Sequence, residues 1–219
     1  MYTTEEMFDL QHTAAAEVLR QLEYPWQMLP KISDFIKALG PTLPEAEYDH
    51  PAEFVWIAKS AKIAPTASIT GPCIIGPETE VRHCAFIRGN ALVGAGAVVG
   101  NSTELKNVIL FDKVQVPHYN YVGDSILGYR AHMGAGSITS NVKSDKTLVI
   151  VKDGTRRIET GLKKFGAILG DCVEVGCGSI LNPGTVVGRN TSIYPLSSVR
   201  TVVPANSIYK CQGEVADKH

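Results

Sequence analysis

The sequence predicts an all-β solenoid, preceded by a helical segment and interrupted by one long loop. Three observations support this fold class. Apolar residues recur at every sixth position from residue 57, small residues recur four positions after them, and residues 1–50 follow a helical pattern instead. A spacing of six fits neither an amphipathic helix, which needs spacings of three and four, nor a half-buried strand, which needs a spacing of two.

The six-residue repeat predicts triangular coils, each built from three short strands and three corners. The aliphatic residue of each repeat is expected to point inward, and the small residue allows the chain to turn. Successive coils should lie about 4.8 Å apart, which is the distance between paired strands. The first aliphatic series is Ile57, Ile63, Ile69, Ile75, Val81, Ile87, Val93, Val99, Leu105 and Phe111, and the later series is Leu127, Met133, Leu169, Val175, Leu181, Val187, Ile193 and Val199.

The first fifty residues predict two short helices and a proline-rich connector. The stretch TTEEMFDLQHTAAAEVLRQL (3–22) begins with a threonine N-cap and acidic residues, and it continues with helical spacing. A second helix over 26–40 is interrupted by Pro30 and closed by Gly40. We therefore expect a helical segment with its linker over 1–50 that caps one end of the solenoid, a β-helix over 51–210 with an excursion at 139–168, and a tail at 211–219.

Composition limits the classes of function. Hydrophobic residues make up 44% of the chain, charged residues 20%, and the net charge is −1, so a buried core is expected and nucleic acid is not the expected partner. Neither a signal peptide nor an apolar run long enough to cross a membrane is recognised. The five cysteines are odd in number and include no CxxC pair, which favours free thiols in a reducing cytoplasm.

Two interruptions of the repeat are where function is expected. Ten residues, in place of six, separate Phe111 from Tyr121, and they include Pro117 and His118. We expect the chain to leave the wall of the solenoid there, so that His118 faces a cleft. The second interruption is the excursion at 139–168, whose two β-prone runs around 152–154 predict a hairpin.

The stretch HYNYVGDSILGYRAHMGAGSITSN (118–141) resembles the acetyltransferase half of the bifunctional glucosamine-1-phosphate acetyltransferase/N-acetylglucosamine-1-phosphate uridyltransferases. It is most similar to the archaeal sugar-1-phosphate nucleotidylyltransferase/acetyltransferase type, which shares a GxxKxGA stretch, found here from Gly161 to Ala167. The resemblance implies a left-handed parallel β-helix and a homotrimer with sites between subunits. It also implies acetyl-CoA as co-substrate and an amino-sugar phosphate similar to glucosamine-1-phosphate as acceptor, in the UDP-N-acetylglucosamine pathway. The nucleotidyltransferase domain of these relatives is not recognised in the chain, so no nucleotidyltransferase activity is expected.

The resemblance also implies roles for individual residues. His118 corresponds to the general base, Glu104 to an acid beside it, and Asn141 to an asparagine near the acetyl group. One departure concerns the identity of the amino sugar, because His132 stands where the family usually has a substrate-binding asparagine. The implied substrate contacts are Arg88, Lys106, Tyr121, His132 and Lys146, and the implied contacts to coenzyme A are Gly134, Ala135, Gly136, Cys177, Lys163 and Lys164.

Elementary chemistry agrees with these roles. A phosphate needs fixed cations, which Arg88, Lys106 and Lys146 supply. Attack of an amine on a thioester needs a proton acceptor with a pKa near neutrality, and histidine, at about 6.5, is suited to this task. The amide of Asn141, or backbone N–H groups of residues 134–136, can hold the developing oxyanion.

Other interpretations remain open at this point. In one of them, the chain is a trimeric solenoid that binds a sugar phosphate but does not catalyse a reaction. In another it is a zinc carbonic anhydrase, but His83, His118 and His132 lack the close histidine pair of such a site, and no metal is expected. Lys163 and Lys164, with Arg156 and Arg157, are either solvated loop charges or contacts to the phosphates of coenzyme A.

Overall fold

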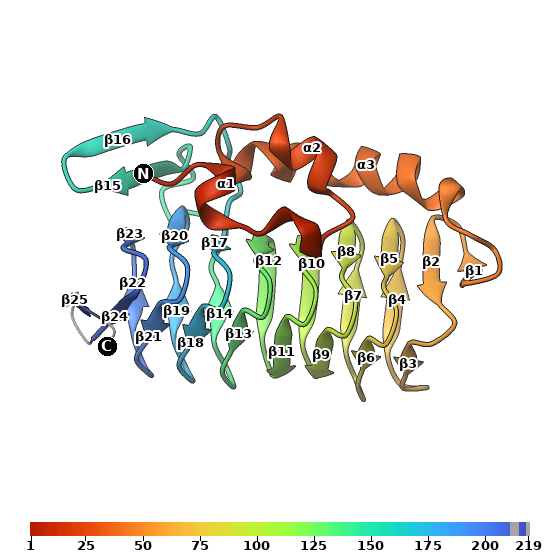
Figure 1. Cartoon of the computed structure of the whole chain (residues 1–219). Coiled ribbons are helices and arrows are strands. Elements are labelled where there is room, and N and C mark those ends of the chain that lie inside the picture. Colours follow the sequence, from red (N-terminus) through yellow and green to blue (C-terminus); the bar gives the residue numbers. More distant parts are fainter. Residues whose placement is uncertain (211–214, 218–219) are drawn as a thin grey trace.

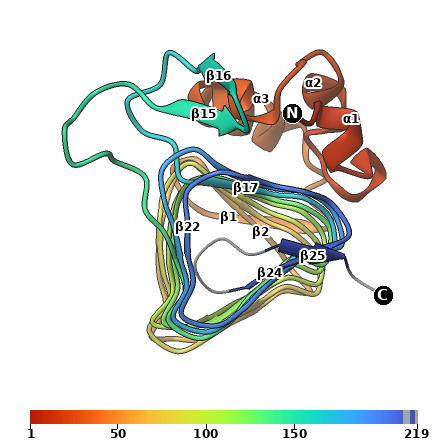
Figure 2. The ribbon, with the colours of Figure 1, turned by 90° about the vertical axis from the view of Figure 1, so that its left-hand side faces the viewer.

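The protein forms a triangular prism of stacked coils with a layer of helices along one side (Figures 1 and 2). This computed structural model describes residues 1–210 and 215–217, so that Cys211 and most of the expected tail at 211–219 lie outside the described residues. In Figure 2 the chain runs clockwise around the prism while it advances toward the viewer, so the coil is left-handed. The predicted fold class, a left-handed parallel β-helix, is confirmed.

Each side of the prism is a parallel sheet, and we name the three sides the covered face, the site face and the third face. The covered face contains β2 (Val55–Ala58), β5 (Cys73–Ile75), β8 (Ala91–Val93), β17 (Ala167–Leu169), β20 (Thr185–Val187) and β23 (Val202–Val203). The site face contains β4 (Ser68–Thr70), β7 (Phe86–Arg88), β14 (Ile138–Thr139), β19 (Ile180–Leu181) and β22 (Ser198–Val199). The third face contains β3 (Lys62–Ile63), β6 (Glu80–Val81), β9 (Val98–Asn101), β11 (Gln115–His118), β13 (His132–Met133), β18 (Glu174–Val175), β21 (Ser192–Ile193) and β24 (Ser207–Tyr209).

Two longer strands connect the site face to the covered face. They are β10 (Glu104–Leu110) and β12 (Tyr121–Leu127), which pair with each other in parallel along their length. Two further strands pair antiparallel with the end coils: β1 (Tyr48–Ala52) with β2, and β25 (Val215–Asp217) with β24. We name the corner that β10 and β12 cross the site corner.

The interior is filled by the aliphatic series that the repeat predicted. Ile75, Ile87, Leu105, Leu127 and Leu181 are fully buried. The small residues of the repeat are buried at the corners, as Thr79, Ala85, Ala91, Ala97 and Thr103 show. Burial of these two positions per repeat supplies the hydrophobic stabilisation of the prism.

The predicted phase of the repeat was wrong after Leu105. Leu110, not Phe111, is the inward residue, because it pairs in register with Val93 before it and Leu127 after it. The repeat is shortened to five residues at the site corner, once in β10 and once in β12. Asn107 and Asp124 turn the chain there with φ angles of 56° and 46°, which shortens the corner by one residue.

The prediction that the chain leaves the wall at His118 was therefore also wrong. β11 continues the third face, and Val116 and His118 pair in register with Val99 and Asn101 of β9. The six-residue repeat is interrupted near His118 because the site corner is one residue shorter both before β11, in β10, and after it, in β12.

The helical layer lies along the covered face (Figure 1). The expectation that it caps one end of the solenoid was therefore wrong. The reason is that the outward residues of this face, such as Ile74 and Leu92, are apolar, and they are buried in one hydrophobic cluster with Met28 and Ile36 of the layer. The expected first helix is divided into α1 (Thr4–Met7), η1 (Leu10–His12) and α2 (Ala16–Arg20), and the second into η2 (Pro25–Lys31), α3 (Ile32–Leu39) and η3 (Gly40–Thr42).

The first helix is divided because the buried carboxylate of Asp171, in the solenoid, accepts a hydrogen bond from the backbone N–H of Asp9. This contact fixes the chain between α1 and η1 against the solenoid. The predicted N-cap of α1 is present, with Thr3 and Glu6 forming a capping box.

The excursion leaves the solenoid after β14 and returns before β17, at the site corner. The predicted hairpin is present as β15 (Ile150–Asp153) and β16 (Arg156–Glu159), and it lies beside the helices (Figure 2). The excursion closes on itself, since Phe165 N–H donates to the carbonyl of Asn141 and Gly166 N–H donates to that of Asp124. This return places the GLKKFGA stretch next to the site corner.

Candidate functional site

Outward side chains of the site face stack in columns because successive coils are in register. Glu104 pairs with Tyr121, and Tyr121 pairs with Ile138. On the preceding coil, the Nε of Arg88 lies 3.1 Å from Oε1 of Glu104. Three of the predicted site residues, Arg88, Glu104 and Tyr121, are thus brought together from three coils.

A polar cluster surrounds Asp124 at the shortened site corner. Asp124 is only 4% exposed. The ammonium of Lys106 lies 3.0 and 3.1 Å from the two carboxylate oxygens of Asp124. Asn107 Nδ2 donates to Oδ1 of Asp124 over 2.9 Å and to the carbonyl of Leu29 in the helical layer over 3.1 Å. Asn141 Nδ2 also donates to Asp124. The cluster fixes Lys106 and Asn141, both predicted site residues, to one buried carboxylate.

Tyr121 joins this cluster through its phenol oxygen, which accepts a hydrogen bond from Asn141 Nδ2 over 3.2 Å. The ring folds back over Gly123, where an added Cβ would lie 2.5 Å from the phenol oxygen. Burial, followed by the negative charges of Asp124 and Glu104, raises the pKa of Tyr121. The phenol therefore keeps its proton at neutral pH and can donate it in a hydrogen bond.

His118 lies at the end of β11, on the corner between the third face and the site face. Its backbone is held on both sides, since its N–H donates to Oδ1 of the buried Asn120 and its carbonyl accepts from Gly136 N–H. The imidazole is exposed, and none of the described residues forms a hydrogen bond with it. Glu104, the acid expected beside His118, contacts Arg88 instead.

The turn at residues 134–136 follows His118 by one coil on the same corner. The N–H groups of Gly134 and Gly136 donate to the carbonyls of Val175 and His118. Among the described residues, none accepts a hydrogen bond from the N–H of Ala135. Cys177, which is exposed, lies against Gly134, where an added Cβ would be 3.0 Å from its Sγ. Ala135 is thus the residue of this turn with an N–H group available to a ligand.

His132 is not part of the Tyr121 cluster, because it lies on the third face. Its Nδ1 is 2.7 Å from Oε2 of Glu174. The pair borders a hollow of about 450 Å³ that is also lined by Lys113, Gln115 and Arg130. Within one chain, the predicted substrate contacts are therefore divided between two faces.

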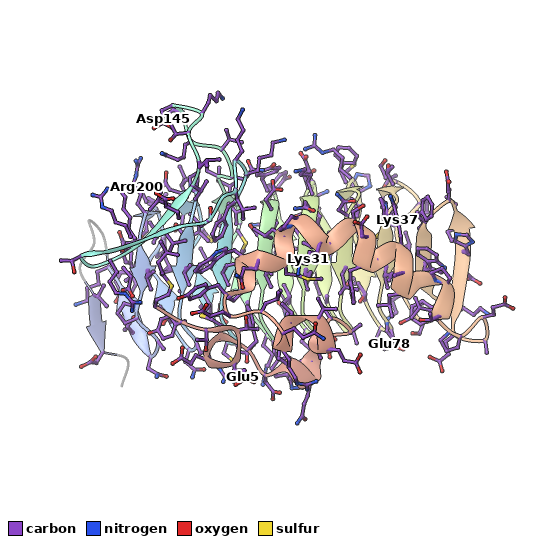
Figure 3. The ribbon with its side chains drawn as sticks, turned by 90° about the horizontal axis from the view of Figure 1, so that it is seen from above. Glu5, Lys31, Lys37, Glu78, Asp145 and Arg200 are labelled. Carbon is purple, nitrogen blue, oxygen red and sulfur yellow. The ribbon has the colours of Figure 1, made fainter. Side chains whose placement is uncertain are left out.

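A second hollow, of about 540 Å³, lies at the site corner between the excursion and the site face. Ser140 and Val142, the neighbours of Asn141, contribute to its wall, and Figure 3 shows Asp145 and Arg200 on this side of the molecule. We name it the basic hollow, because four of its lining residues are Lys143, Lys152, Arg157 and Arg200, against one acid, Asp145.

The charges of the basic hollow are mostly uncompensated. Lys143 pairs with Asp145 at 3.2 Å, whereas Lys152, Arg157 and Arg200 form no ion pair within residues 1–210. The predicted contacts Lys146, Lys163 and Lys164 are exposed but do not line this hollow.

Sequence reasoning missed Asp124, Asn107 and most of the cations of the basic hollow. A signal for Asp124 was present, because the repeat loses one residue at that point. The cations carried little signal, since Lys143, Lys152 and Arg157 come from the excursion and Arg200, far away in the sequence, follows β22.

The described residues offer no group of three or more histidine, cysteine or acidic side chains that could hold a metal ion. His83 instead contacts Thr66 Oγ1, at 2.7 Å. Cys73, Cys84, Cys172 and Cys177 are free thiols. Over the described part of the chain, no helix is both long and apolar enough to cross a membrane.

The chain is similar in sequence to known proteins that contain hexapeptide repeats. The sequence profile of the GMPPB C-terminal domain matches residues 69–193. The bifunctional protein GlmU of Methanococcus maripaludis is 38% identical over 152 residues, which are 61% of this chain and 37% of that protein. The bifunctional sugar-1-phosphate nucleotidylyltransferase/acetyltransferase of Sulfurisphaera tokodaii is 30% identical over 126 residues, 58% of this chain and 31% of that protein.

The chain thus spans about a third of the length of these curated relatives. Among solved structures, a point mutant of AntD, an N-acyltransferase from Bacillus cereus in complex with dTDP and coenzyme A, aligns with a TM-score of 0.41 and 15% identity. That alignment covers 79% of this chain and 91% of that one.

Proposed function

Because the chain belongs to the GMPPB C-terminal domain family, and because one relative is named as an acetyltransferase, we propose that it is an acetyl-CoA-dependent N-acetyltransferase acting on an amino-sugar phosphate. One observation carries this proposal. Residues that the family resemblance assigned to such a site, namely Arg88, Glu104, Lys106, Tyr121 and Asn141, are close together on the site face and its corner.

The proposed reaction is attack of the sugar amine on the acetyl thioester. The amine nitrogen forms a bond to the carbonyl carbon, and His118 accepts the proton that the nitrogen loses. The N–H of Ala135 stabilises the oxyanion of the tetrahedral intermediate. The carbon–sulfur bond then breaks, and the coenzyme A thiolate leaves and takes up a proton. The exposed imidazole of His118 is suited to this role because its ring is free of intramolecular hydrogen bonds among the described residues.

Arg88, Lys106 and Tyr121 are proposed to bind the sugar phosphate. Arg88 is half exposed, and its guanidinium has donors beyond the Nε that contacts Glu104. The ammonium of Lys106 is partly exposed and retains donor capacity beyond its contact with Asp124. Carboxylates neutralise both cations in this structure. A bound phosphate would therefore be held mainly by directed hydrogen bonds and less by net positive charge. An amino sugar with a phosphate on its ring, such as glucosamine-1-phosphate, presents the required groups.

The basic hollow is proposed to receive the phosphates of coenzyme A. It begins beside Asn141, the residue that the family resemblance placed near the acetyl group, and Lys152, Arg157 and Arg200 supply uncompensated charge there. A compact set of fixed cations suits the diphosphate and 3′-phosphate of the coenzyme. This assignment replaces Lys163 and Lys164 as the proposed phosphate contacts.

The active assembly is proposed to be a homotrimer with a site between subunits. His132 is on the third face, away from Tyr121, so a second copy must supply it if both contact the same sugar. Exposed apolar residues along the His118 corner and the site face support such a contact: Phe86, Tyr119, Ile180, Tyr194 and Leu196. Association would bury this surface.

The test is incubation of the purified chain with acetyl-CoA and a panel of amino sugars and their phosphates, with free thiol as the readout. Thiol release that depends on an amino-sugar phosphate is the expected result. The competing function is non-catalytic binding of a sugar phosphate, which is favoured by the contact of Glu104 with Arg88 and not with His118. Binding of glucosamine-1-phosphate by calorimetry, without thiol release from any acceptor, would support that function and reject ours.

A further inference from the structure

The side-chain amide of Asn141 has both of its N–H groups engaged within the protein. Nδ2 donates to the carboxylate of Asp124 and to the phenol oxygen of Tyr121. An amide nitrogen carries only two hydrogens. The group of Asn141 that remains for a ligand is therefore its oxygen, Oδ1.

The orientation of this amide is determined by Asp124. The two ends of an amide are distinguished by their hydrogen-bond partners, and a carboxylate paired with an ammonium only accepts hydrogen bonds. Turning the Asn141 amide around would place Oδ1 against the oxygens of Asp124, in a site that is almost fully buried, where the repulsion would be costly. Lys106 and Asn107 hold the carboxylate itself in place.

Tyr121 and Gly123 are consistent with the same orientation. The phenol of Tyr121 accepts from Asn141, so its own hydrogen is free to be donated outward. Gly123 leaves the space that the ring needs, because a Cβ at this position would lie 2.5 Å from the phenol oxygen and 2.9 Å from Asn141 Nδ2. The cluster thus presents an acceptor at Asn141 and a donor at Tyr121.

We infer that Asp124 is a positioning residue, which turns the amide of Asn141 so that its oxygen, and not its amino group, faces the substrate. Asn141 then accepts a hydrogen bond from the amine or a hydroxyl of the bound sugar. It does not stabilise the oxyanion, because it has no N–H group left to donate. The inference rests on the proposed function for the identity of the bound group, but the orientation of the amide is independent of it.

Exchanging the side chains of Asp124 and Asn141 tests whether residue 141 acts as a hydrogen-bond acceptor for the substrate. Asp124→Asn and Asn141→Asp are each expected to lower kcat/KM for acetyl transfer by about 100-fold, because the pair loses its donor–acceptor match. In the Asp124→Asn/Asn141→Asp double variant, residue 124 donates, and residue 141 again presents an oxygen to the substrate. We expect the double variant to recover to within about tenfold of the wild type. A double variant no more active than Asn141→Asp would reject the acceptor role, since Asp at 141 cannot donate to an oxyanion.

A second measurement does not depend on turnover. In protein labelled with ¹⁵N-asparagine, the side-chain amide signal of Asn141 is assigned by its loss in Asn141→Asp. Both of its hydrogens should exchange slowly with solvent in the wild type and rapidly in Asp124→Asn. Unchanged exchange in Asp124→Asn, with the fold intact by circular dichroism, would overturn the inference. If the wild type transfers no acetyl group to any acceptor, the proposed function fails, while this measurement still decides the orientation of the amide.

Discussion

The ammonium of Lys106 and the buried carboxylate of Asp124 form an ion pair across two adjacent coils, with distances of 3.0 and 3.1 Å to the two oxygens. They are 18 positions apart in the sequence, one more than the turn of the solenoid that brings Lys106 into register with Gly123. The pair means that Lys106 does not add net charge to the site face. The uncompensated cations lie in the basic hollow beside it, and this division leads to the first prediction.

Replacing Arg200 by alanine should weaken the binding of acetyl-CoA. Arg200 lines the basic hollow and has no ion-pair partner among the described residues. Loss of one charge-assisted contact to a phosphate is expected to raise the KM for acetyl-CoA by about tenfold, or ~1.4 kcal/mol, with little change in kcat. The measurement is steady-state kinetics at two salt concentrations, and the effect should shrink at the higher one.

Lys164→Ala is the matched control for Arg200→Ala, since Lys164 is also an exposed cation but lies on the excursion without lining the hollow. Its KM for acetyl-CoA should stay close to the wild-type value. An equal increase in both variants would mean that the coenzyme responds to overall charge and not to this hollow.

Replacing His118 by alanine should remove most of the activity without affecting the fold. If the imidazole is the proton acceptor, kcat should fall by about 10²- to 10⁴-fold, or roughly 3 to 5 kcal/mol of barrier. The melting temperature and the trimer should hardly change, because the side chain is exposed and its backbone contacts remain. Full activity of a folded His118→Ala variant would remove His118 from catalysis.

Replacing Leu196 by glutamate should dissociate the proposed trimer. Leu196 is 84% exposed on the corner that also carries Tyr119, and its φ angle of 59° projects it from the solenoid. A large apolar side chain this exposed is expected to be buried by association. Light scattering should give three times 23.6 kDa for the wild type and the mass of a single chain for the variant. A wild type that is monomeric at micromolar concentration would reject both the trimer and the intersubunit site.

Asp171 should make the stability of the protein depend on pH. Burial raises the pKa of Asp171, although hydrogen bonds from the backbone N–H groups of Asp9 and Tyr129 act in the opposite direction. The folded protein therefore binds this proton more tightly than the unfolded chain does. The contribution of Asp171 to the free energy of unfolding is greatest at low pH. It decreases as the pH rises from the ordinary carboxyl pKa of about 3.9 through the raised one.

Urea unfolding of the wild type and Asp171→Asn across the acidic range is the measurement for this effect. The variant loses an acceptor for the hydrogen bonds of Asp171, so it should be less stable by about 1–3 kcal/mol. The difference between the two proteins should be larger at acidic than at neutral pH, because only the wild type has the titrating group. A difference that is constant with pH would mean that the pKa of Asp171 is the same in the folded and unfolded states.

The sequence alone was sufficient to identify the six-residue repeat. It was much less sufficient to predict the phase of the repeat, that is, which residues point inward along the whole chain. A spacing of six determines which side chains point inward over each short strand, because that choice is local. The spacing shows that residues are lost between Leu105 and Leu127, but it does not show at which corner, because that depends on which strands pair in register. For this reason His118 was expected in a protruding loop, although it ends a strand in the wall.

The location of the helical layer could also have been found in the sequence. On the covered face the residue before the inward one is regularly apolar, as in Ile74, Leu92 and Ile109. On the other faces this position holds charged residues, such as Glu80 and Glu104, as well as apolar ones, such as Phe86 and Ile180. Two adjacent apolar residues on a two-sided strand indicate burial on both sides. This pattern predicts a partner for one side of the prism, and the helical residues 1–42 are that partner.

The sequence by itself determined the solenoid, the excursion with its hairpin, and the candidate residues from Arg88 to Asn141. Only the tertiary structure decided which of these residues contact one another. It pairs Arg88 with Glu104 and Lys106 with Asp124, places His132 on another face, and surrounds the basic hollow with cations from the excursion and with Arg200. The physical reason is that the direction of a side chain follows from the local repeat. Its partners lie a full coil or an entire excursion away, and no local pattern records them.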